Sequence, residues 1–517
     1  MLRVILRAAL LAAILPATSE AKTLCVNGST GSDVNSYFLN NGINVCWQTI
    51  GRAAWGSTNR SAPNVSEAAQ AGDVVRITPG VYTTAGRNFA SDGLGGGARF
   101  LITYNPVNSG TSGSPIRFEC TTVRGCHLRH TAGTWGPMIG AAQEGPSRQY
   151  IQWSGFVLDA QYNVGFCDSG LVLFYGDAGL SPLNLGGVIE NSEIIGQLDP
   201  SLDGGGVCTA SDPNNYDGVR LEYASGTVIR NNIIRNFGGQ PIVQTTRDHN
   251  HAAVTTYNSS SITIEYNNIS NSGSGVYLKA NIQTAPTTHT VRYNRIFDVE
   301  RGVVVHRSPG TAALPVLIYQ NIISDTDDEG VQILAFSGTS VTDPLHVKVI
   351  NNTFYNCGNQ GFEWTGGSSL ANAGHVFWNN IVQGGGMSLN FGALAHLATD
   401  RFDAEHNLYN GFVNFALVGV TTTTFNTWKS THLQDTDDGG SADGVSGVNP
   451  NFVDAGSADF HLQVGSPALA LGRVHPTYSI GGSAGATIPA GAYITGTEII
   501  GVAGDGLRDR RVCRSTL

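Results

Sequence analysis

Charged side chains are scarce in this chain. Lys, Arg, Asp and Glu together make up 13% of its 517 residues, the net charge is −10, and only four residues are lysines. An acidic chain with so few cations has no broad basic surface, which argues against nucleic acid and anionic membranes as partners. An anionic substrate would therefore have to be held by a local basic patch.

Long hydrophobic runs are missing after residue 21. A membrane-spanning helix needs ~20 consecutive apolar residues, and no later stretch approaches that length. Residues 1–21 combine a basic start, an apolar stretch from Val4 to Pro16 and a small-residue end, which is typical of a cleaved secretory signal. We expect a secreted protein, extracellular or periplasmic, with no membrane partner, and we expect a monomer.

Closely spaced cysteine pairs of the zinc-binding kind are also missing. The eight cysteines fit an oxidising compartment. Proximity along the chain suggests the pairs Cys25–Cys46, Cys120–Cys126 and Cys167–Cys208. Because eight cysteines allow many connectivities, the pairing stays open.

Asparagine recurs at a regular interval in the second half of the chain. The residues are spaced by 27, 27, 31, 28 and 27 positions and are Asn267, Asn294, Asn321, Asn352, Asn380 and Asn407. A fixed period of this size is typical of a solenoid, and the flanking runs are too short and alternating for helices. The pattern predicts coils of parallel β-strands. Asparagine suits their tight bend because it tolerates a left-handed backbone and can bond to the same amide one coil above.

Aligning the coils on a recurrent glycine predicts which side chains point outward, because every second side chain of a strand faces the same way. The first position of each coil is the glycine or its equivalent: Gly218, Ala252, Gly275, Gly302, Gly330 and Gly361. The second and fourth positions are mostly apolar and are predicted to face inward. The outward fifth position reads Glu222, Thr256, Lys279, His306, Leu334 and Thr365. The outward third position reads Arg220, Val254, Tyr277, Val304, Gln332 and Glu363. Neighbouring strands lie ~4.8 Å apart, so Lys279 and His306 are predicted to lie side by side.

The segments at both ends of the repeats resemble a known family. The segment Gly72–Tyr82, with its Gly-Asp and Pro-Gly pairs, and the segment Asn449–Pro467 resemble secreted right-handed parallel β-helix proteins, the pectate-lyase-like superfamily. The resemblance covers most of residues 45–470. It implies an all-β, right-handed parallel β-helix (solenoid) with an N-terminal helical cap, for which Cys46–Trp55 is the candidate. This architecture hosts lyases, hydrolases, epimerases, esterases and binders, so the resemblance implies fold rather than function.

The domain organisation follows from this interpretation. Residues 1–21 are assigned to the signal peptide, 22–110 to the N-terminal cap and first coils, 111–470 to the β-helix and 471–517 to a C-terminal cap or tail. An open end of a β-solenoid would template aggregation. The last segment is therefore expected to fold back over that end.

Lys279 is the first candidate for catalysis. It lies in an outward column beside His306, and residues 279–307 hold five Lys or Arg against Asp298 and Glu300. We interpret this segment as the local basic patch. The alternative is an ordinary surface lysine on a solvated strand face.

These side chains suit β-elimination on a uronic-acid polysaccharide. The uronate carboxylate must be neutralised, a base must remove the C5 proton, and an acid can assist the leaving oxygen. A lysine has an ordinary pKa of ~10.4, so it needs cationic neighbours or partial burial to act as the base.

The stretches 275–279 and 291–307 are similar to the catalytic stretch of the alginate lyase and chondroitinase B family of polysaccharide lyases. The resemblance implies that Lys279 is the base and that His306 and Arg307 complete the catalytic set, although the family has its arginine before its histidine. It also implies calcium as a cofactor, for which Glu222 and Asp248 are the candidate ligands.

Further residues on the same face are assigned to substrate binding. They are Tyr277, Arg220, Arg301 and His251. Two acidic runs, Asp325–Glu329 and Asp435–Asp438, offer oxygen ligands for calcium, but neither has EF-hand spacing and solvated turns are preferred.

The leading hypothesis is an extracellular lyase acting on an anionic polysaccharide. A C5-epimerase on the same fold and a non-catalytic glycan-binding or surface β-helix protein are the alternatives. A glycoside hydrolase needs two carboxylates about 5–9 Å apart. The outward pair Glu222 and Glu363 lies several coils apart, which disfavours that reaction.

Overall fold

A computed structural model describes residues 21–492, except for segments between the strands. Those segments are 60–61, 85–101, 131–136, 143–147, 161–168, 177–183, 197–215, 238–251, 281–287, 307–313, 335–345, 366–373, 392–401, 412–414, 418–419, 437–442 and 478–484. The predicted signal peptide, except for its last residue, lies outside the described residues. Within the described ranges, no helix has the length and apolarity needed to cross a membrane.

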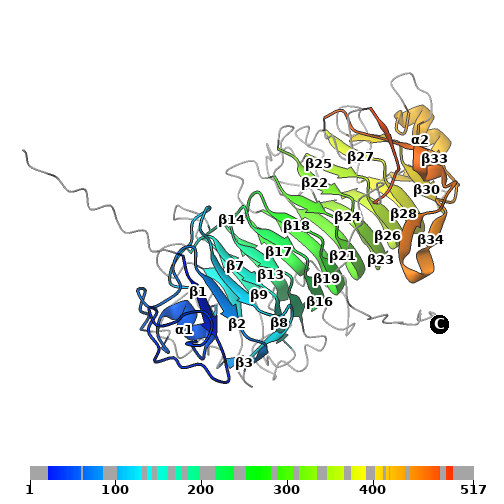
Figure 1. The fold of residues 1–517 in the computed structure, drawn as a ribbon. Coiled ribbons are helices and arrows are strands. Elements are labelled where there is room, and N and C mark those ends of the chain that lie inside the picture. The colour runs from blue at the N-terminus through cyan, green and yellow to red at the C-terminus, as the bar shows by residue number, and fades with distance from the viewer. Residues whose placement is uncertain are drawn as a thin grey trace, which may run out of the picture.

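The chain winds into an elongated parallel β-helix, with β1 and α1 at one end and α2 at the other (Figure 1). Its first face, which we call sheet A, has 12 described strands, one from each successive coil, and all pair in parallel. They are β1 (Thr23–Val26), β2 (Val74–Ile77), β4 (Ile116–Cys120), β7 (Ile151–Ser154), β11 (Val188–Glu190), β15 (Val228–Arg230), β18 (Thr263–Glu265), β20 (Thr290–Arg292), β22 (Val316–Tyr319), β25 (Val347–Ile350), β27 (His375–Trp378) and β29 (Phe402–Glu405).

The other two faces form one connected network of 19 described strands. Several strands bend at a corner and belong to both faces; they are β19 (Asn268–Lys279), β21 (Arg295–His306), β26 (Thr353–Thr365) and β28 (Ile381–Phe391). Strands before that corner are β3 (Gly80–Thr84), β5 (Cys126–His130), β8 (Phe156–Asp159), β12 (Glu193–Ile195), β16 (Ile233–Phe237), β23 (Ile322–Thr326), β30 (Leu408–Asn410) and β33 (Val445–Ser446). Strands after it are β6 (Ile139–Ala142), β9 (Ser169–Tyr175), β13 (Tyr216–Glu222), β17 (Ala252–Tyr257), β24 (Glu329–Leu334) and β31 (Phe415–Leu417), to which β32 (Val420–Thr423) pairs antiparallel.

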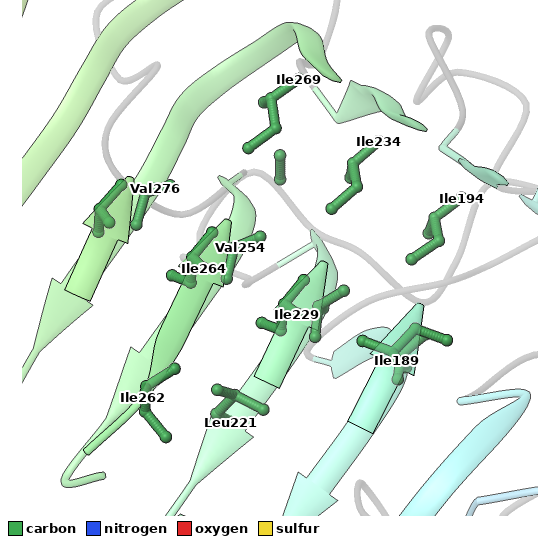
Figure 2. Close-up of a cluster of buried hydrophobic side chains, with 14 of the residues drawn as sticks. Ile189, Ile194, Leu221, Ile229, Ile234, Val254, Ile262, Ile264, Ile269 and Val276 are labelled. Carbon is green, nitrogen blue, oxygen red and sulfur yellow. The ribbon is translucent and has the colours of Figure 1, made fainter. Parts of the chain in front are cut away.

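The core consists of aligned aliphatic columns that run through the stack. Figure 2 shows Ile189, Ile229 and Ile264 following one another along sheet A, facing the column Ile194, Ile234 and Ile269. All six are fully buried. Burial of such side chains contributes about 1.5–3 kcal/mol each, so every added coil extends the same stabilising column.

The asparagine column forms a continuous hydrogen-bonded ladder at the corner after sheet A. From Asn267 to Asn407, each Asn Oδ1 accepts from the backbone and side-chain nitrogens of the asparagine one coil earlier, at 2.8–3.2 Å. The ladder contains the six predicted residues and one more, Asn232, all no more than 1% exposed. Each amide also donates to a sheet A carbonyl, as Asn267 does to Ile229 at 2.9 Å. These bonds satisfy buried backbone groups that the bend would otherwise leave without partners.

The left-handed backbone belongs to the residue before each ladder asparagine. That position has φ between 53° and 57° in every rung, and it holds Asn231, Tyr266, Tyr293, Gln320, Asn351, Asn379 and His406. The predicted link between asparagine and left-handed geometry is therefore wrong for the ladder itself. Tyrosine, glutamine and histidine also occupy the left-handed position before the ladder, so that position does not require asparagine. The ladder asparagines are needed for their stacked amides.

Asp435 closes the ladder at its C-terminal end. Its Oδ1 accepts from the backbone and side chain of Asn407 at 3.2 and 3.0 Å, and its Oδ2 accepts from Trp428 Nε1 and the Tyr409 hydroxyl, both at 3.0 Å. The residue is completely buried. The prediction of a solvated turn was wrong for Asp435. All four of the groups that bond to it are donors, and a carboxylate, with four acceptor positions and no donor, can accept from each of them.

The helix α2 (Phe425–His432) follows the last coils and buries Trp428 against Phe391 and Phe415. The described part of the C-terminal segment, 471–477 and 485–492, packs along the ladder corner. Asn379 and Arg473 exchange bonds at 2.6 and 2.9 Å, and Ala492 donates to Thr353 at 3.0 Å. The described part of this segment therefore lies along the side of the last coils. The predicted C-terminal cap stays a prediction, because residues 493–517 lie outside the described residues. Within this segment, β36 (Gly472–Arg473) pairs antiparallel with β37 (Thr487–Ile488). Before it, β34 (Phe452–Asp454) pairs antiparallel with β35 (Asp459–Leu462).

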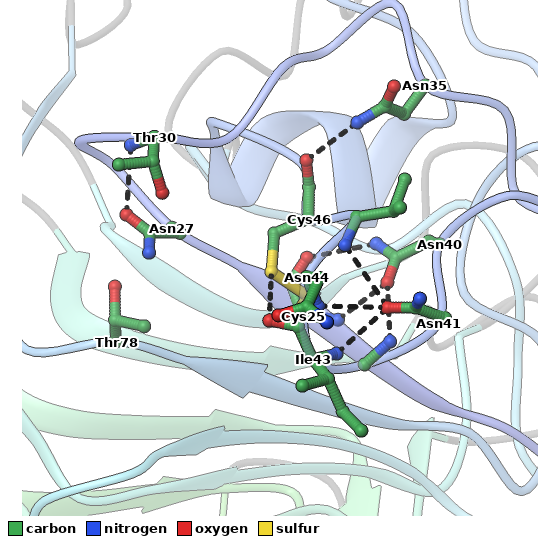
Figure 3. Close-up of a disulfide and its surroundings, with 12 residues drawn as sticks. Cys25, Asn27, Thr30, Asn35, Asn40, Asn41, Ile43, Asn44, Cys46 and Thr78 are labelled. Carbon is green, nitrogen blue, oxygen red and sulfur yellow. Dashed lines mark hydrogen bonds between the residues drawn. A yellow bond between two sulfur atoms is a disulfide. The ribbon is translucent and has the colours of Figure 1, made fainter.

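At the N-terminal end, α1 (Ile50–Trp55) forms inside the predicted helical segment and buries Ile50, Ala53 and Ala54 in the core. The N-terminal helical cap itself stays a prediction. Of the predicted disulfides, Cys25–Cys46 (Figure 3) and Cys120–Cys126 are confirmed, whereas Cys167 and Cys208 lie outside the described residues.

The strand register corrects one coil of the outward columns. Tyr257, rather than Thr256, pairs with both Glu222 and Lys279, and Thr255 replaces Val254 in the third column. The sequence alignment placed Ala252 where the glycine of other coils lies, but Val219 pairs with Val254, so the coil is shifted by one residue. A shift of one residue exchanges inward and outward side chains.

The ladder leads to a direct stability prediction. Asn267→Ala should lower the free energy of unfolding by at least about 3 kcal/mol, because Asn232 loses two bonds and the Ile229 carbonyl loses one. Urea unfolding followed by circular dichroism measures the loss. Asn268→Ala, at the next, half-buried position, should cost well under 1 kcal/mol. Similar losses for both variants would contradict a stabilising role of the ladder.

A second prediction concerns the last rung. Asp435→Asn should lower the free energy of unfolding by about 2–4 kcal/mol, because its amide N–H2 would face the donors Trp428 Nε1 and Tyr409 O–H. Thermal unfolding in the presence of a chelator measures the effect. A variant as stable as the parent would show that the carboxylate is not required there.

Candidate functional site

Lys279 and His306 are neighbours on the strands β19 and β21, as predicted. The register pairs Lys279 with His306 and Tyr277 with Val304. Lys279 is half-buried at the end of its strand, and its Nζ lies 6.0 Å from the centre of the Tyr257 ring. The two side chains therefore lie on the outer surface of the same face, one coil apart.

Tyr277 holds His306 through its hydroxyl group. The Tyr277 oxygen lies 2.6 Å from His306 Nδ1, and the side chains are 1% and 9% exposed. This bond fixes the orientation of the imidazole ring, and the partner of Nδ1 decides which tautomer is present. Tyr277 also packs with Ala252 and Val304 in a small apolar cluster outside the main core. The predicted substrate-binding tyrosine is thus largely covered and is placed to position the histidine.

Three predicted site residues lie outside the described residues. They are Arg307, His251 and Asp248. Arg307 directly follows His306 at the end of β21. Their predicted roles therefore stay predictions.

Arg220 and Glu222 bind each other. The Arg220 guanidinium donates to the Glu222 carboxylate and, at 3.2 Å, to Asp217. Asp217 is fully buried, and this burial raises its pKa to about 6 against the opposing effect of Arg220. Glu222 is 4% exposed and lies two strands from Lys279, with Tyr257 between. The Glu222 carboxylate is thus engaged in an ion pair, and its role as a calcium ligand stays a prediction.

Two of the four arginines in the predicted basic patch pair with acids from neighbouring coils, so the net positive charge of the patch is smaller than the count within 279–307 suggests. Arg292 bonds to Glu265 at 2.6 Å, and Arg301 bonds to Glu329 at 2.9 Å and to Asp328 at 3.3 Å. The sequence comparison counted only the acids between 279 and 307. Parallel stacking brings in carboxylates that lie about one period away in sequence.

A second polar cluster lies further along the same face and was not recognised in the sequence. Gln332 donates to Glu363 Oε2 at 2.6 Å, Asn390 donates to Glu363 Oε1 at 2.8 Å, and Gln360 donates to Glu329 Oε1 at 3.1 Å. Burial, the Glu363 carboxylate and Asp328 raise the pKa of Glu329 to about 8, against the opposing effect of Arg301. Gln332, Glu363 and Asn390 follow one another in the outward third column. This run of polar residues is the signal that could have revealed the cluster.

The raised pKa of Glu329 predicts a pH dependence of stability. The folded protein keeps a proton that the unfolded chain releases above its ordinary value of 4.5, so stability falls as pH rises towards about 8. The buried His289 and His475, with pKa values lowered to about 4, contribute little above about pH 6.5. Between about pH 6.5 and 8 the free energy of unfolding should fall by about 1–2 kcal/mol.

Urea titrations at several pH values measure this slope. Glu329→Gln should flatten it, whatever its effect on absolute stability, because the group that titrates is gone. Equal slopes for the variant and the parent would contradict the raised pKa.

Comparisons with known proteins support the fold. A family model described as "Right handed beta helix region" matches residues 162–343, and one described as "Disaggregatase related" matches residues 315–433. No curated protein matches the chain.

Three solved structures to which this chain is similar are the following. Pectate lyase Pel9A aligns with a TM-score of 0.50 at 15% identity, covering 92% of this chain and 98% of its own. The PL6 family polysaccharide lyase Pedsa3628 from Pseudopedobacter saltans has a TM-score of 0.41 at 12% identity, covering 77% and 95%. The mannuronan C-5 epimerase AlgE6 A-module from Azotobacter vinelandii has a TM-score of 0.40 at 13% identity, covering 67% and 87%.

At these identities the likeness concerns the fold alone. The family model, the parallel sheets and the alignment with Pel9A agree with one another. The chain is therefore a right-handed parallel β-helix protein with the pectate-lyase-like fold.

Proposed function

We propose that this protein is a secreted polysaccharide lyase that cleaves an anionic, uronic-acid-containing polysaccharide by β-elimination, with Lys279 as the base. The observation that carries the proposal is the position of Lys279 beside His306 on one outer face, with His306 held by Tyr277. A pectate lyase has the same fold, which is compatible with a polysaccharide as the substrate.

The roles follow from the chemistry of the step. Lys279, as the neutral amine, takes the proton from C5 of the uronate and becomes an ammonium group. The electron pair forms the C4–C5 double bond, and the bond from C4 to the leaving oxygen breaks. His306 donates a hydrogen bond to the uronate carboxylate or protonates the leaving oxygen.

Tyr277 positions His306 for this task. A ring that is fixed in advance loses no orientational freedom when the sugar binds, and the transition state benefits from this preorganisation. Arg307 follows His306 in the chain and is proposed to add the positive charge that neutralises the uronate. No step is assigned to calcium, because Glu222 is engaged by Arg220.

Substitution of Lys279 tests the proposal. Lys279→Ala should lower the rate of β-elimination by about 10²–10⁴-fold, the usual contribution of a positioned base. The measurement is the ultraviolet absorbance of the unsaturated product released from a panel of alginate, pectate and glycosaminoglycans. Melting temperatures should stay equal, since Lys279 lies at the outer end of a strand.

Lys429→Ala, on helix α2, is the matched control and should keep the full rate. Unchanged release by Lys279→Ala would remove this residue from the mechanism. Binding of a glycan without any product would favour the non-catalytic β-helix. Exchange of the C5 proton without chain cleavage would favour the C5-epimerase.

A further inference from the structure

The corner beside the last full rung of the ladder gathers two carboxylates and one imidazole. Glu405 is the last residue of β29, His406 occupies the left-handed position before Asn407, and Asp443 comes from the segment that leads into β33. Asp443 is placed by its backbone N–H, which donates to the Asp435 carbonyl at 3.1 Å. Two separate stretches of chain therefore meet at this point.

The three side chains converge at the distances of metal ligands. His406 Nε2 lies 3.8 Å from Glu405 Oε2 and 3.8 Å from Asp443 Oδ2, and the three ligand atoms all lie within 4.8 Å of one another. These separations exceed a hydrogen bond of about 2.7–3.2 Å. An ion equidistant from the three atoms would lie about 2.2–2.5 Å from each, which is close to the metal–ligand bonds of divalent cations in proteins.

Several charged pairs among the described residues lie at hydrogen-bond distance, closer than the 3.8 Å separations at this corner. In the same outward column of sheet A, Glu190 and Glu265 each pair with an arginine of the next strand at 2.6 Å. In the same column, the register places Glu405 next to Trp378. On the C-terminal segment, His461 Nδ1 meets Asp459 at 2.6 Å, as an ordinary hydrogen-bonded pair does.

The ligand atoms are also held in place. The His406 ring lies edge-on to Trp378 at 5.5 Å between centroids, and Trp378 Nε1 donates to Asp403 at 3.0 Å. The backbone of Glu405 accepts from Asn379 at 3.0 Å. The side chains of Glu405, His406 and Asp443 are 20%, 16% and 10% exposed, so an ion could reach them from solvent. Ordered surroundings of this kind raise the affinity of a metal site.

We propose that Glu405, His406 and Asp443 bind one divalent transition-metal ion, with Zn²⁺ as the preferred occupant and Mn²⁺ as the next. One imidazole nitrogen and two carboxylate oxygens suit these ions, whereas Ca²⁺ and Mg²⁺ prefer oxygen ligands alone. The ion ties the segment around Asp443 to the last coil and so stabilises the C-terminal end of the stack. This site is independent of the proposed reaction at Lys279.

The test uses untagged, full-length protein after treatment with a chelator and buffer exchange. Calorimetric titration with ZnCl₂ should show one bound equivalent that depends on this site, and the melting temperature should rise by about 2 °C or more at saturating Zn²⁺. His406→Asn should lose both effects. Asparagine fits the backbone, because Asn379 and Asn351 occupy the same left-handed position one and two coils earlier, respectively.

His461→Asn is the matched control and should keep both effects. Asp443→Asn serves as an independent variant and should weaken Zn²⁺ binding at least tenfold. The absence of any bound equivalent in the parent protein would overturn the proposal. Zn²⁺ binding that is equally strong in His406→Asn and Asp443→Asn would also overturn it, since the ion would then bind elsewhere.

Discussion

The stacked amides at the corner after sheet A are the interaction on which the rest of this structure depends. Each buried asparagine bonds to the next one and to a strand carbonyl, so the bend and the register are fixed together. The aliphatic columns gain their burial only while this register holds. Asp435 ends the series because its carboxylate only accepts hydrogen bonds. Trp428 and Tyr409 donate to its second oxygen.

A fixed register converts distance in sequence into contact in space. It sets Lys279 against His306 across 27 residues, joins Arg301 to Glu329 across 28, and brings Glu405 and His406 to Asp443. The same stacking pairs Arg292 and Arg301, near the proposed site, with acids of neighbouring coils. Lys279 and the Tyr277–His306 pair are the groups that the proposed reaction uses.

The sequence predicted the fold and the Lys279–His306 contact because both follow from a regular period. It failed where a coil departs from that period. The coil at Ala252 lacks the expected glycine, so the alignment placed Thr256 in the outward column that Tyr257 occupies in the structure. It overestimated the positive charge of the basic patch, because Glu265 and Glu329, which pair with Arg292 and Arg301, come from other coils. It also failed for Asp435, because an aspartate in an acidic run has the same local pattern whether it is solvated or buried.

The central claim is that a uronate binds over Lys279 and His306 and loses its C5 proton there. The most direct measurement is a crystal structure of the Lys279→Ala protein with an oligosaccharide of the substrate that the parent protein degrades. The account predicts a uronate carboxylate within hydrogen-bond distance of His306 and a C5 hydrogen directed at position 279. An oligosaccharide bound on another face, with no contact to His306, would contradict it.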